Sequence, residues 1–325
     1  MKNSTYSFIL AIATFTCGLW TSECHSQYTK LLDFTGATNG KHPNGTLISD
    51  GTFLYGTTTD GGTTDNGVIF KIMPDGSGYS KLLDFAGISN GNHPTGSLVT
   101  DGTNLFGMTY DGGANNLGVL FKIKPDGTGY SNLIAFSGSP AGSNPYGSLL
   151  YDGTFLYGMT FKGGTNDGGI VFKIKPDGTG YVKLLDFLGA SNGGGPYGSL
   201  ISDGTFLYGM TSYGGTANLG LVFKVKTDGT GYMKLLDFTG SANGSDPSGT
   251  LFYDGTFLYG MTVNGGANND GNLFKLKPDG TAYSTLLDFA GLTNGKNPVG
   301  ALVSDGTYLY GTTSTGGANS VKLVH

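Results

Sequence analysis

The chain has 325 residues, of which 60 are glycine, and its formal net charge is −5. Aromatic residues make up 12% of the chain, which is too many for a disordered protein, and all 18 basic residues are lysine. Because arginine, the residue best suited to bidentate phosphate contacts, is absent, we expect no nucleic-acid partner. Many glycine-rich turns between aromatic-rich segments favour an all-β fold.

Residues 1–26 have the layout of a secretory signal peptide. Lys2 precedes an apolar run over 8–13, and a short polar stretch leads to Ser26, where we place the cleavage site. The apolar run is too short to cross a bilayer as a helix. Both cysteines lie in this leader, so we expect a mature chain without disulfides, and Cys17 is a weak match to a lipidation site. The leader predicts export to the cell surface or the medium.

The rest of the chain, 27–325, consists of six copies of a 51-residue repeat. A phenylalanine, a proline and an Asp-Gly pair recur at this spacing. The phenylalanines are Phe34, Phe85, Phe136, Phe187, Phe238 and Phe289. The Asp-Gly pairs begin at Asp50, Asp101, Asp152, Asp203, Asp254 and Asp305. Since no insertion separates these anchors, we expect a single domain without linkers.

Each repeat holds four short runs with the composition of β-strands, as in the repeat that begins at Pro196. These runs cover 199–202, 205–211, 221–225 and 232–238. Asp203-Gly204 separates the first two runs and is a preferred pair for a two-residue type I′ turn, in which both residues have positive φ. Four antiparallel strands in about 50 residues are typical of a β-propeller blade. The sequence therefore predicts an all-β, six-bladed propeller.

The two ends of the repeat region complement each other. Residues 28–34 form a fourth-type strand with no repeat before them, and residues 298–313 supply the first two strands of a last repeat. Residues 320–324 can serve as a shortened third strand, but no fourth strand follows. We expect the N-terminal strand to complete the sixth blade and close the ring, which would cover two strand edges.

The repeated side chains predict scaffold roles. Phe206 and Tyr208 lie two residues apart on one strand face, which we expect to pack between blades. Gly209 would leave room for an opposing ring. Asp203 and its equivalents are expected to stabilise turns, because a catalytic site needs unlike groups that converge on one point.

Two known repeats resemble this pattern. The order Leu-Tyr-Gly, Gly-Gly, Phe-Lys, Pro-Asp-Gly and Leu-Leu-Asp-Phe resembles the kelch blade, but the tryptophan of that blade is absent. The chain is more similar to the bacterial tandem repeat called GloVer, through Leu156-Tyr157-Gly158-Met159-Thr160, Gly163-Gly164 and residues 169–174. This resemblance covers 28–317. It implies an exported or surface-attached bacterial protein and transfers no catalytic residues.

The residue types give little support to a metal site or a hydrolase triad. Outside the leader the histidines are His42, His93 and His325 and no cysteine remains, so we expect no zinc. His42 and His93 occupy equivalent loop positions in neighbouring repeats, which argues against a Ser-His-Asp triad. The loops are rich in Asp and Asn but contain no D-x-[DN]-x-[DN]-G run, so we expect no cofactor and keep calcium as an alternative.

The copies differ mainly in the fourth-to-first and second-to-third loops, which share one face of a propeller. Five aromatic residues in or next to these loops are predicted to form a ligand-binding patch: Tyr110, Tyr146, Phe161, Tyr197 and Tyr213. Loops on a rigid scaffold are a common place for recognition. The alternative is that these are solvated loops whose tyrosines have no function.

These observations favour a secreted or cell-surface, non-enzymatic module that binds an extracellular glycan or protein. We expect a monomer without a membrane span. An enzyme acting on polysaccharide is one alternative, and it would need a carboxylate pair or a His–acid pair on one face, which the sequence does not single out. A purely structural component of the cell envelope is another.

Overall fold

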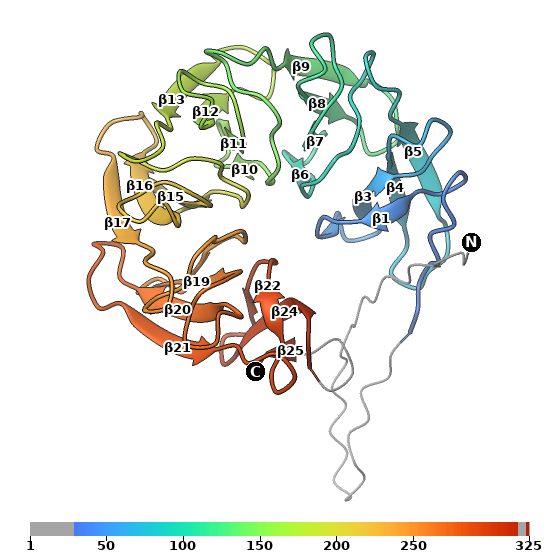
Figure 1. Ribbon diagram of the computed structural model, residues 1–325. Helices are drawn as coiled ribbons and strands as arrows, with labels where there is room; N and C mark the ends of the chain where they lie inside the picture. Colours follow the sequence, from blue (N-terminus) through green and yellow to red (C-terminus); the bar gives the residue numbers. More distant parts are fainter. Residues whose placement is uncertain (1–28, 318–322, 325) are drawn as a thin grey trace, which may run out of the picture.

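The structure is a computed structural model that describes residues 29–317 and 323–324. Its strands form six antiparallel sheets arranged around a central axis (Figure 1). No helix occurs among these described residues. The predicted all-β, six-bladed propeller is confirmed. The predicted signal peptide, 1–26, lies outside the described residues.

The blades share one order of strands, with the first strand nearest the axis and the fourth at the rim. The first blade contains β2 (Ile48–Ser49), β3 (Leu54–Asp60), β4 (Val68–Ile72) and β5 (Ser80–Asp84). The second contains β6 (Val99–Thr100), β7 (Leu105–Thr109), β8 (Val119–Ile123) and β9 (Ser131–Ala135). The third contains β10 (Leu150–Tyr151), β11 (Leu156–Thr160), β12 (Ile170–Ile174) and β13 (Val182–Asp186).

The fourth and fifth blades repeat this order, and the sixth has its first three strands in the described part of the chain. The fourth contains β14 (Ile201–Ser202), β15 (Phe206–Thr211), β16 (Leu221–Lys226) and β17 (Met233–Asp237). The fifth contains β18 (Phe252–Tyr253), β19 (Leu258–Thr262), β20 (Asn272–Leu276) and β21 (Ser284–Asp288). The sixth contains β23 (Val303–Ser304), β24 (Leu309–Thr315) and β25 (Leu323–Val324). Two further short strands, β1 (Lys41–Pro43) and β22 (Lys296–Pro298), pair with β3 and β24.

The turn between the first and second strands differs from the predicted type I′ turn. In the fourth blade, the last pair between β14 and β15 is Ser202 with Leu207, so four positions lie between these two residues. Gly204 has a φ of 91°, but Asp203 is not in the left-handed region. The Asp203 carboxylate instead accepts hydrogen bonds from the amides of Thr205 and Phe206, at 2.8 and 2.7 Å. The predicted turn type was wrong because this side-chain capping favours a different backbone, whereas the turn-stabilising role of the acid is confirmed.

Aromatic rings fill the space between neighbouring blades. Tyr208 is 1% exposed and belongs to an apolar cluster with Leu251 and Phe274 of the next blade. Phe238, which follows β17, meets the edge of the Phe274 ring at 5.4 Å between ring centroids. A Cβ on Gly209 would lie 2.8 Å from the Phe223 ring, so this glycine makes room for a ring of its own blade. The predicted packing roles are confirmed.

The N-terminal segment packs on the first blade as a fourth strand packs on the blade that follows it. The Phe34 and Phe70 rings meet edge to face at 5.3 Å, as Phe85 and Phe121 do at 5.4 Å. At the other end, β25 pairs with β24 as a shortened third strand. These positions agree with a composite sixth blade, but residues 29–34 are not assigned as a strand. Residues 318–322, which connect β24 to β25, lie outside the described part.

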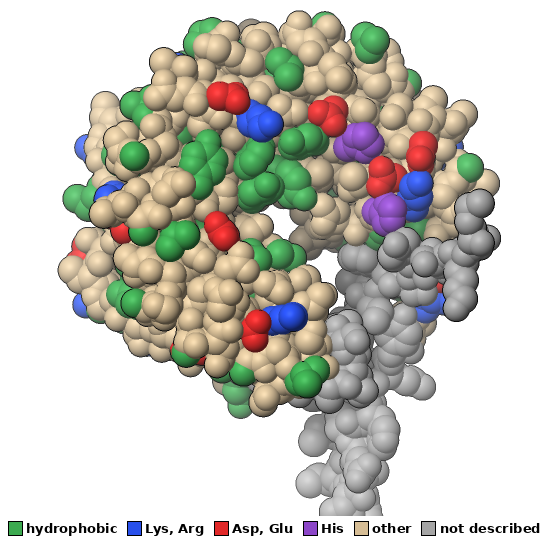
Figure 2. Space-filling view, viewed as in Figure 1, with side chains coloured by type: hydrophobic (Ala, Val, Ile, Leu, Met, Phe, Trp, Pro, Cys, Tyr) green, Lys and Arg blue, Asp and Glu red, His purple; other side chains and the backbone are tan. Residues whose placement is uncertain are grey.

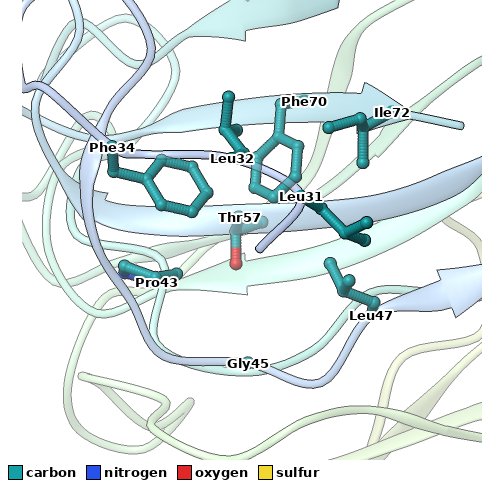
Figure 3. A pocket seen from close by; sticks show the side chains of 9 residues that line it. All are labelled: Leu31, Leu32, Phe34, Pro43, Gly45, Leu47, Thr57, Phe70 and Ile72. Atoms are coloured by element: carbon teal, nitrogen blue, oxygen red, sulfur yellow. The ribbon is translucent and has the colours of Figure 1, made fainter. Parts of the chain in front are cut away.

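A small cavity lies where the N-terminal segment meets the first blade (Figure 3). Its volume is about 30 Å³. Most of its walls are apolar, and they include Leu31, Leu32, Phe34, Leu47, Phe70 and Ile72. A space of this size holds about one or two water molecules, so it is not a site for an organic ligand.

Candidate functional site

The two variable loops of each repeat meet on one face of the ring. In the third blade, the amide of Ser143 donates to the carbonyl of Lys162, and the amide of Phe161 donates to the carbonyl of Asn144. These bonds join the loop before β10 to the loop after β11. The predicted common face is therefore confirmed, and Figure 2 shows it with the axial opening near its centre.

A cavity of about 340 Å³ lies on the axis. The same three positions of all six repeats line it: 44–46, 95–97, 146–148, 197–199, 248–250 and 299–301. These segments precede the innermost strands. None of the lining side chains carries a charge.

Hydroxyl groups connect neighbouring blades around this cavity. The amides of Thr46, Ser97 and Ser148 donate to the side-chain oxygens of Ser97, Ser148 and Ser199, at 2.7 to 2.8 Å. The amide of Ser199 donates to the hydroxyl of Thr250 at 3.0 Å. Each hydroxyl that accepts in this way still has its own proton to donate. The wall of the cavity therefore combines hydrogen-bonding capacity with an absence of charge.

Four of the predicted aromatic residues form a continuous chain of ring contacts at the mouth of the cavity. The Tyr110 and Tyr146 rings lie 5.9 Å apart at an interplanar angle of 83°. The Tyr146 and Tyr197 rings lie 5.0 Å apart, also at 83°. The Phe161 ring lies 4.5 Å from the Tyr197 ring at 39°. Edge-to-face contacts of this kind hold each ring in place.

Tyr213 joins this group across a glycine. A Cβ on Gly195 would lie 2.6 Å from the Tyr213 ring and 2.9 Å from the Phe161 ring, so both rings lie close to Gly195. We call Tyr110, Tyr146, Phe161, Tyr197 and Tyr213 the aromatic cluster. Figure 2 shows apolar side chains gathered beside the axial opening. The structure thus brings all five predicted residues together, on loops of the second to fourth blades.

The cluster exists because two positions of the repeat carry aromatic residues in some copies and other residues in the remaining copies. Tyr146 and Tyr197 directly follow the proline that recurs every 51 residues. The other repeats have Asn44, Thr95, Ser248 and Val299 at this position. Tyr110 and Phe161 directly follow the second strand, where the other repeats have Thr59, Ser212, Val263 and Ser314. The scaffold therefore accepts small and polar side chains at these positions, and aromatic residues are not needed for the fold.

Three tyrosines of the cluster, Tyr110, Tyr197 and Tyr213, are half-buried and neutral. Burial is the main cause that raises the pKa of Tyr110, Tyr197 and Tyr213 above its usual value. Nearby carboxylates add to the effect, Asp111 for Tyr110 and Asp167 for Tyr213. At physiological pH these phenols keep their protons and can donate hydrogen bonds.

A chain of histidines and aspartates lies over the first two blades, on the same face. His42 Nδ1 and Asp60 Oδ2 are 2.6 Å apart. The two ring nitrogens of His93 each lie 3.4 Å from a carboxylate oxygen, one of Asp60 and one of Asp111. His93 therefore bridges the acids of two neighbouring blades.

The expectation that no His–acid pair would stand out was wrong. The loop before the proline of one repeat lies over the end of the second strand of the previous repeat, which places His93 against Asp60. A signal was present in the sequence, because Asp60 and Asp111 recur at the same 51-residue spacing as His42 and His93. The contacts His42–Asp60 and His93–Asp111 each join residues 18 positions apart within one repeat, whereas His93–Asp60 joins two repeats.

Within residues 29–317 and 323–324, no group of three or more His, Cys, Asp or Glu side chains is placed to hold a metal ion. In the same part of the chain, no helix has the length and apolar character needed to cross a membrane. Calcium stays a prediction that the site geometry does not test.

Comparisons with known proteins identify the repeat family and show which solved structures share the fold. The family model of the Gloeobacter/Verrucomicrobia repeat matches residues 19–160 and 140–324, which confirms the expected GloVer resemblance. No curated protein matches the chain. A chain of the nidogen/laminin complex is similar in structure, with a TM-score of 0.52 and 17% identity, over 80% of this chain and 86% of that chain.

Two further solved structures share the fold. The extracellular domain of a protein from B. thetaiotaomicron, described as a one-component system, has a TM-score of 0.60 and 14% identity, over 91% of this chain and 34% of that chain. An oligogalacturonate lyase in complex with manganese has a TM-score of 0.55 and 15% identity, over 85% and 72%. At such low identity these likenesses show the propeller fold alone.

Proposed function

The chain belongs to the Gloeobacter/Verrucomicrobia repeat family, and on that basis we propose that it is an exported, non-enzymatic module that binds an extracellular partner through the aromatic cluster. The chain of ring contacts from Tyr110 through Tyr146 and Tyr197 to Phe161 carries the proposal. Rings held in place beside a cavity supply contact area at a low cost in conformational entropy. The turns on the opposite face vary little between repeats, whereas the aromatic cluster makes the binding face asymmetric.

The leader and the composition of the mature chain support export. Residues 1–26 combine a basic start, an apolar run and a polar end, as secretory signals do. The same export would place the aromatic cluster outside the cytoplasm, where its partner must be found. Loss of export on deletion of the apolar run 8–13 tests this part of the proposal, with the extracellular fraction as the readout.

The binding role is tested with the double variant Tyr146→Thr, Tyr197→Ser. Each change introduces the residue that another repeat has at the same position, Thr95 or Ser248, so the fold should persist. We expect the exported wild-type protein to retain partners from a glycan array or from the envelope proteins of the producing cells, and the variant to lose them. A variant that keeps every interaction, with an unchanged melting temperature, would contradict the proposal.

An acid–base enzyme is the second candidate, and the His42–Asp60–His93 contacts favour it. A carboxylate that holds an imidazole by one ring nitrogen is a common way to orient a general base. The test is release of reducing ends from a panel of polysaccharides by wild-type protein and by the variant His42→Gln, Asp60→Asn. Release by the wild type that is lost in this variant would favour the enzyme over the binding module.

A further inference from the structure

We propose that the aromatic cluster binds an uncharged glycan whose chain end enters the axial cavity. This inference rests on the proposed binding function and names its ligand class. Three independent properties of the site lead to it, namely the arrangement of the rings, the chemistry of the cavity wall and the charge around the mouth.

The arrangement of the rings suits a sugar better than a flat aromatic ligand. Tyr146 and Tyr197 belong both to the cluster and to the wall of the cavity. Their rings are nearly perpendicular, at 83°, so they form a corner and not a slot with two parallel faces. A corner of this kind offers one apolar ring face for the C–H side of a pyranose, and phenol hydroxyls for its oxygens.

The cavity wall matches the hydrogen-bonding pattern of a polyol. Ser97, Ser148, Ser199 and Thr250 each accept a backbone amide and keep a proton to donate. Because a sugar hydroxyl both donates and accepts, it can pair with any of them. The volume of about 340 Å³ is at the lower end of the range for small-molecule sites, so the cavity takes a chain end and not a whole polymer.

The charge around the mouth gives no preference for an acidic or a basic ligand. The side chains just after the second strands or just before the prolines include three carboxylates, Asp60, Asp111 and Asp246, and three lysines, Lys41, Lys162 and Lys296. Figure 2 shows acidic and basic side chains on several sides of the opening. Since no excess of either sign attracts a charged ligand to this face, an uncharged glycan fits it.

The experiment uses an array with neutral and acidic oligosaccharides, and measures the dissociation constant of the best-binding oligosaccharide by calorimetry. We expect the protein to bind neutral oligosaccharides with a dissociation constant that changes little with salt. The variant Tyr146→Thr, Tyr197→Ser should have a dissociation constant about tenfold larger or more. The matched control is Tyr151→Ser, Tyr253→Ser on the opposite face, where other repeats have Ser49, Ser202 and Ser304. This control should bind as the wild type does.

A second variant tests the entry of the chain end. Ser148→Ala, Ser199→Ala introduces the residue that the sixth repeat has at this position, Ala301, and should weaken binding several-fold. Unchanged affinity in this variant would overturn the role of the cavity. Binding confined to acidic glycans, or to a protein that needs Tyr146 and Tyr197, would overturn the neutral-glycan inference and leave the binding function intact. No binding of any kind through these tyrosines would overturn both.

Discussion

Single carboxylates tie the surface turns of this protein to its core. The Tyr208 hydroxyl donates to Asp203 Oδ2 at 2.7 Å, while the other carboxylate oxygen accepts two backbone amides. Because Tyr208 is almost fully buried, this hydrogen bond attaches the turn to the core. The second blade lacks this link, since Phe106 stands at the tyrosine position and Asp101 is met by the Asn104 side chain at 3.4 Å.

This difference between blades gives an internal comparison. Asp203→Ala removes two amide bonds and the tyrosine bond, whereas Asp101→Ala removes two amide bonds and a longer contact. We expect Asp203→Ala to lower the free energy of unfolding by about 1 kcal/mol more than Asp101→Ala does. Urea denaturation of the two variants measures the difference. Equal losses of unfolding free energy would mean that the hydrogen bond from the tyrosine does not stabilise the turn.

The same carboxylates predict how stability depends on pH. The Phe53 amide, followed by the Tyr55 hydroxyl, lowers the pKa of Asp50, and the Tyr310 hydroxyl is the main cause that lowers the pKa of Asp305 to about 2. A lowered folded-state pKa contributes stability that is present above the unfolded value of about 4 and is lost as the pH falls through the folded value. The urea midpoint should therefore fall between about pH 4 and pH 2.

The control for this prediction keeps the turn but removes the ionisation. Asn at positions 50 and 305 retains an oxygen for the two backbone amides of each turn, so the fold should tolerate Asp50→Asn, Asp305→Asn. We expect the midpoint of this variant to fall less steeply below pH 4 than that of the wild type. Identical slopes would show that these two acids do not contribute to acid unfolding.

At the level of the strands, the sequence predicted the second, third and fourth strands of the fourth blade to within a residue or two. The run 205–211 corresponds to β15, and the run 232–238 corresponds to β17. The first strand is shorter than its run of 199–202, because the Ser199 amide bonds to Thr250 of the next blade instead of to its own sheet. Strand composition does not reveal that a backbone amide pairs with a side chain of a neighbouring repeat.

The candidate site, too, could be predicted from the repeat only in part. The aromatic cluster was predictable because Tyr146 and Tyr197 are unlike the residues at the same position of the other repeats. The recurrence of Asp60 and Asp111 at the spacing of His42 and His93 indicated an acid near each histidine, but the bridge from His93 to Asp60 also depends on how one blade lies beside the next. Contacts within a repeat follow from periodicity, whereas contacts between repeats require the geometry of the assembled ring.

For the whole molecule, the packing of blades at the axis is the feature that determines how the ring closes. One glycine of each repeat lies there: Gly45, Gly96, Gly147, Gly198, Gly249 and Gly300. A Cβ on any of the first five would collide with the carbonyl of the next glycine in the series. A Cβ on Gly300 would meet only Thr312 Oγ1, at 3.4 Å. Among the described residues, five contacts between blades are therefore tight at the axis and the sixth is wider.

This asymmetry predicts different effects for one substitution at two equivalent positions. Neither Gly198 nor Gly300 has a positive φ, so both backbones accept alanine. Gly198→Ala should lower the free energy of unfolding by about 1–3 kcal/mol, because the opposing carbonyl belongs to a packed backbone that cannot move aside. Gly300→Ala should be neutral or stabilising by up to about 1 kcal/mol, since it restricts the unfolded chain without a clash. Melting temperatures of the two variants test this, and an equal loss for both would show that the sixth contact closes as tightly in solution as the other five.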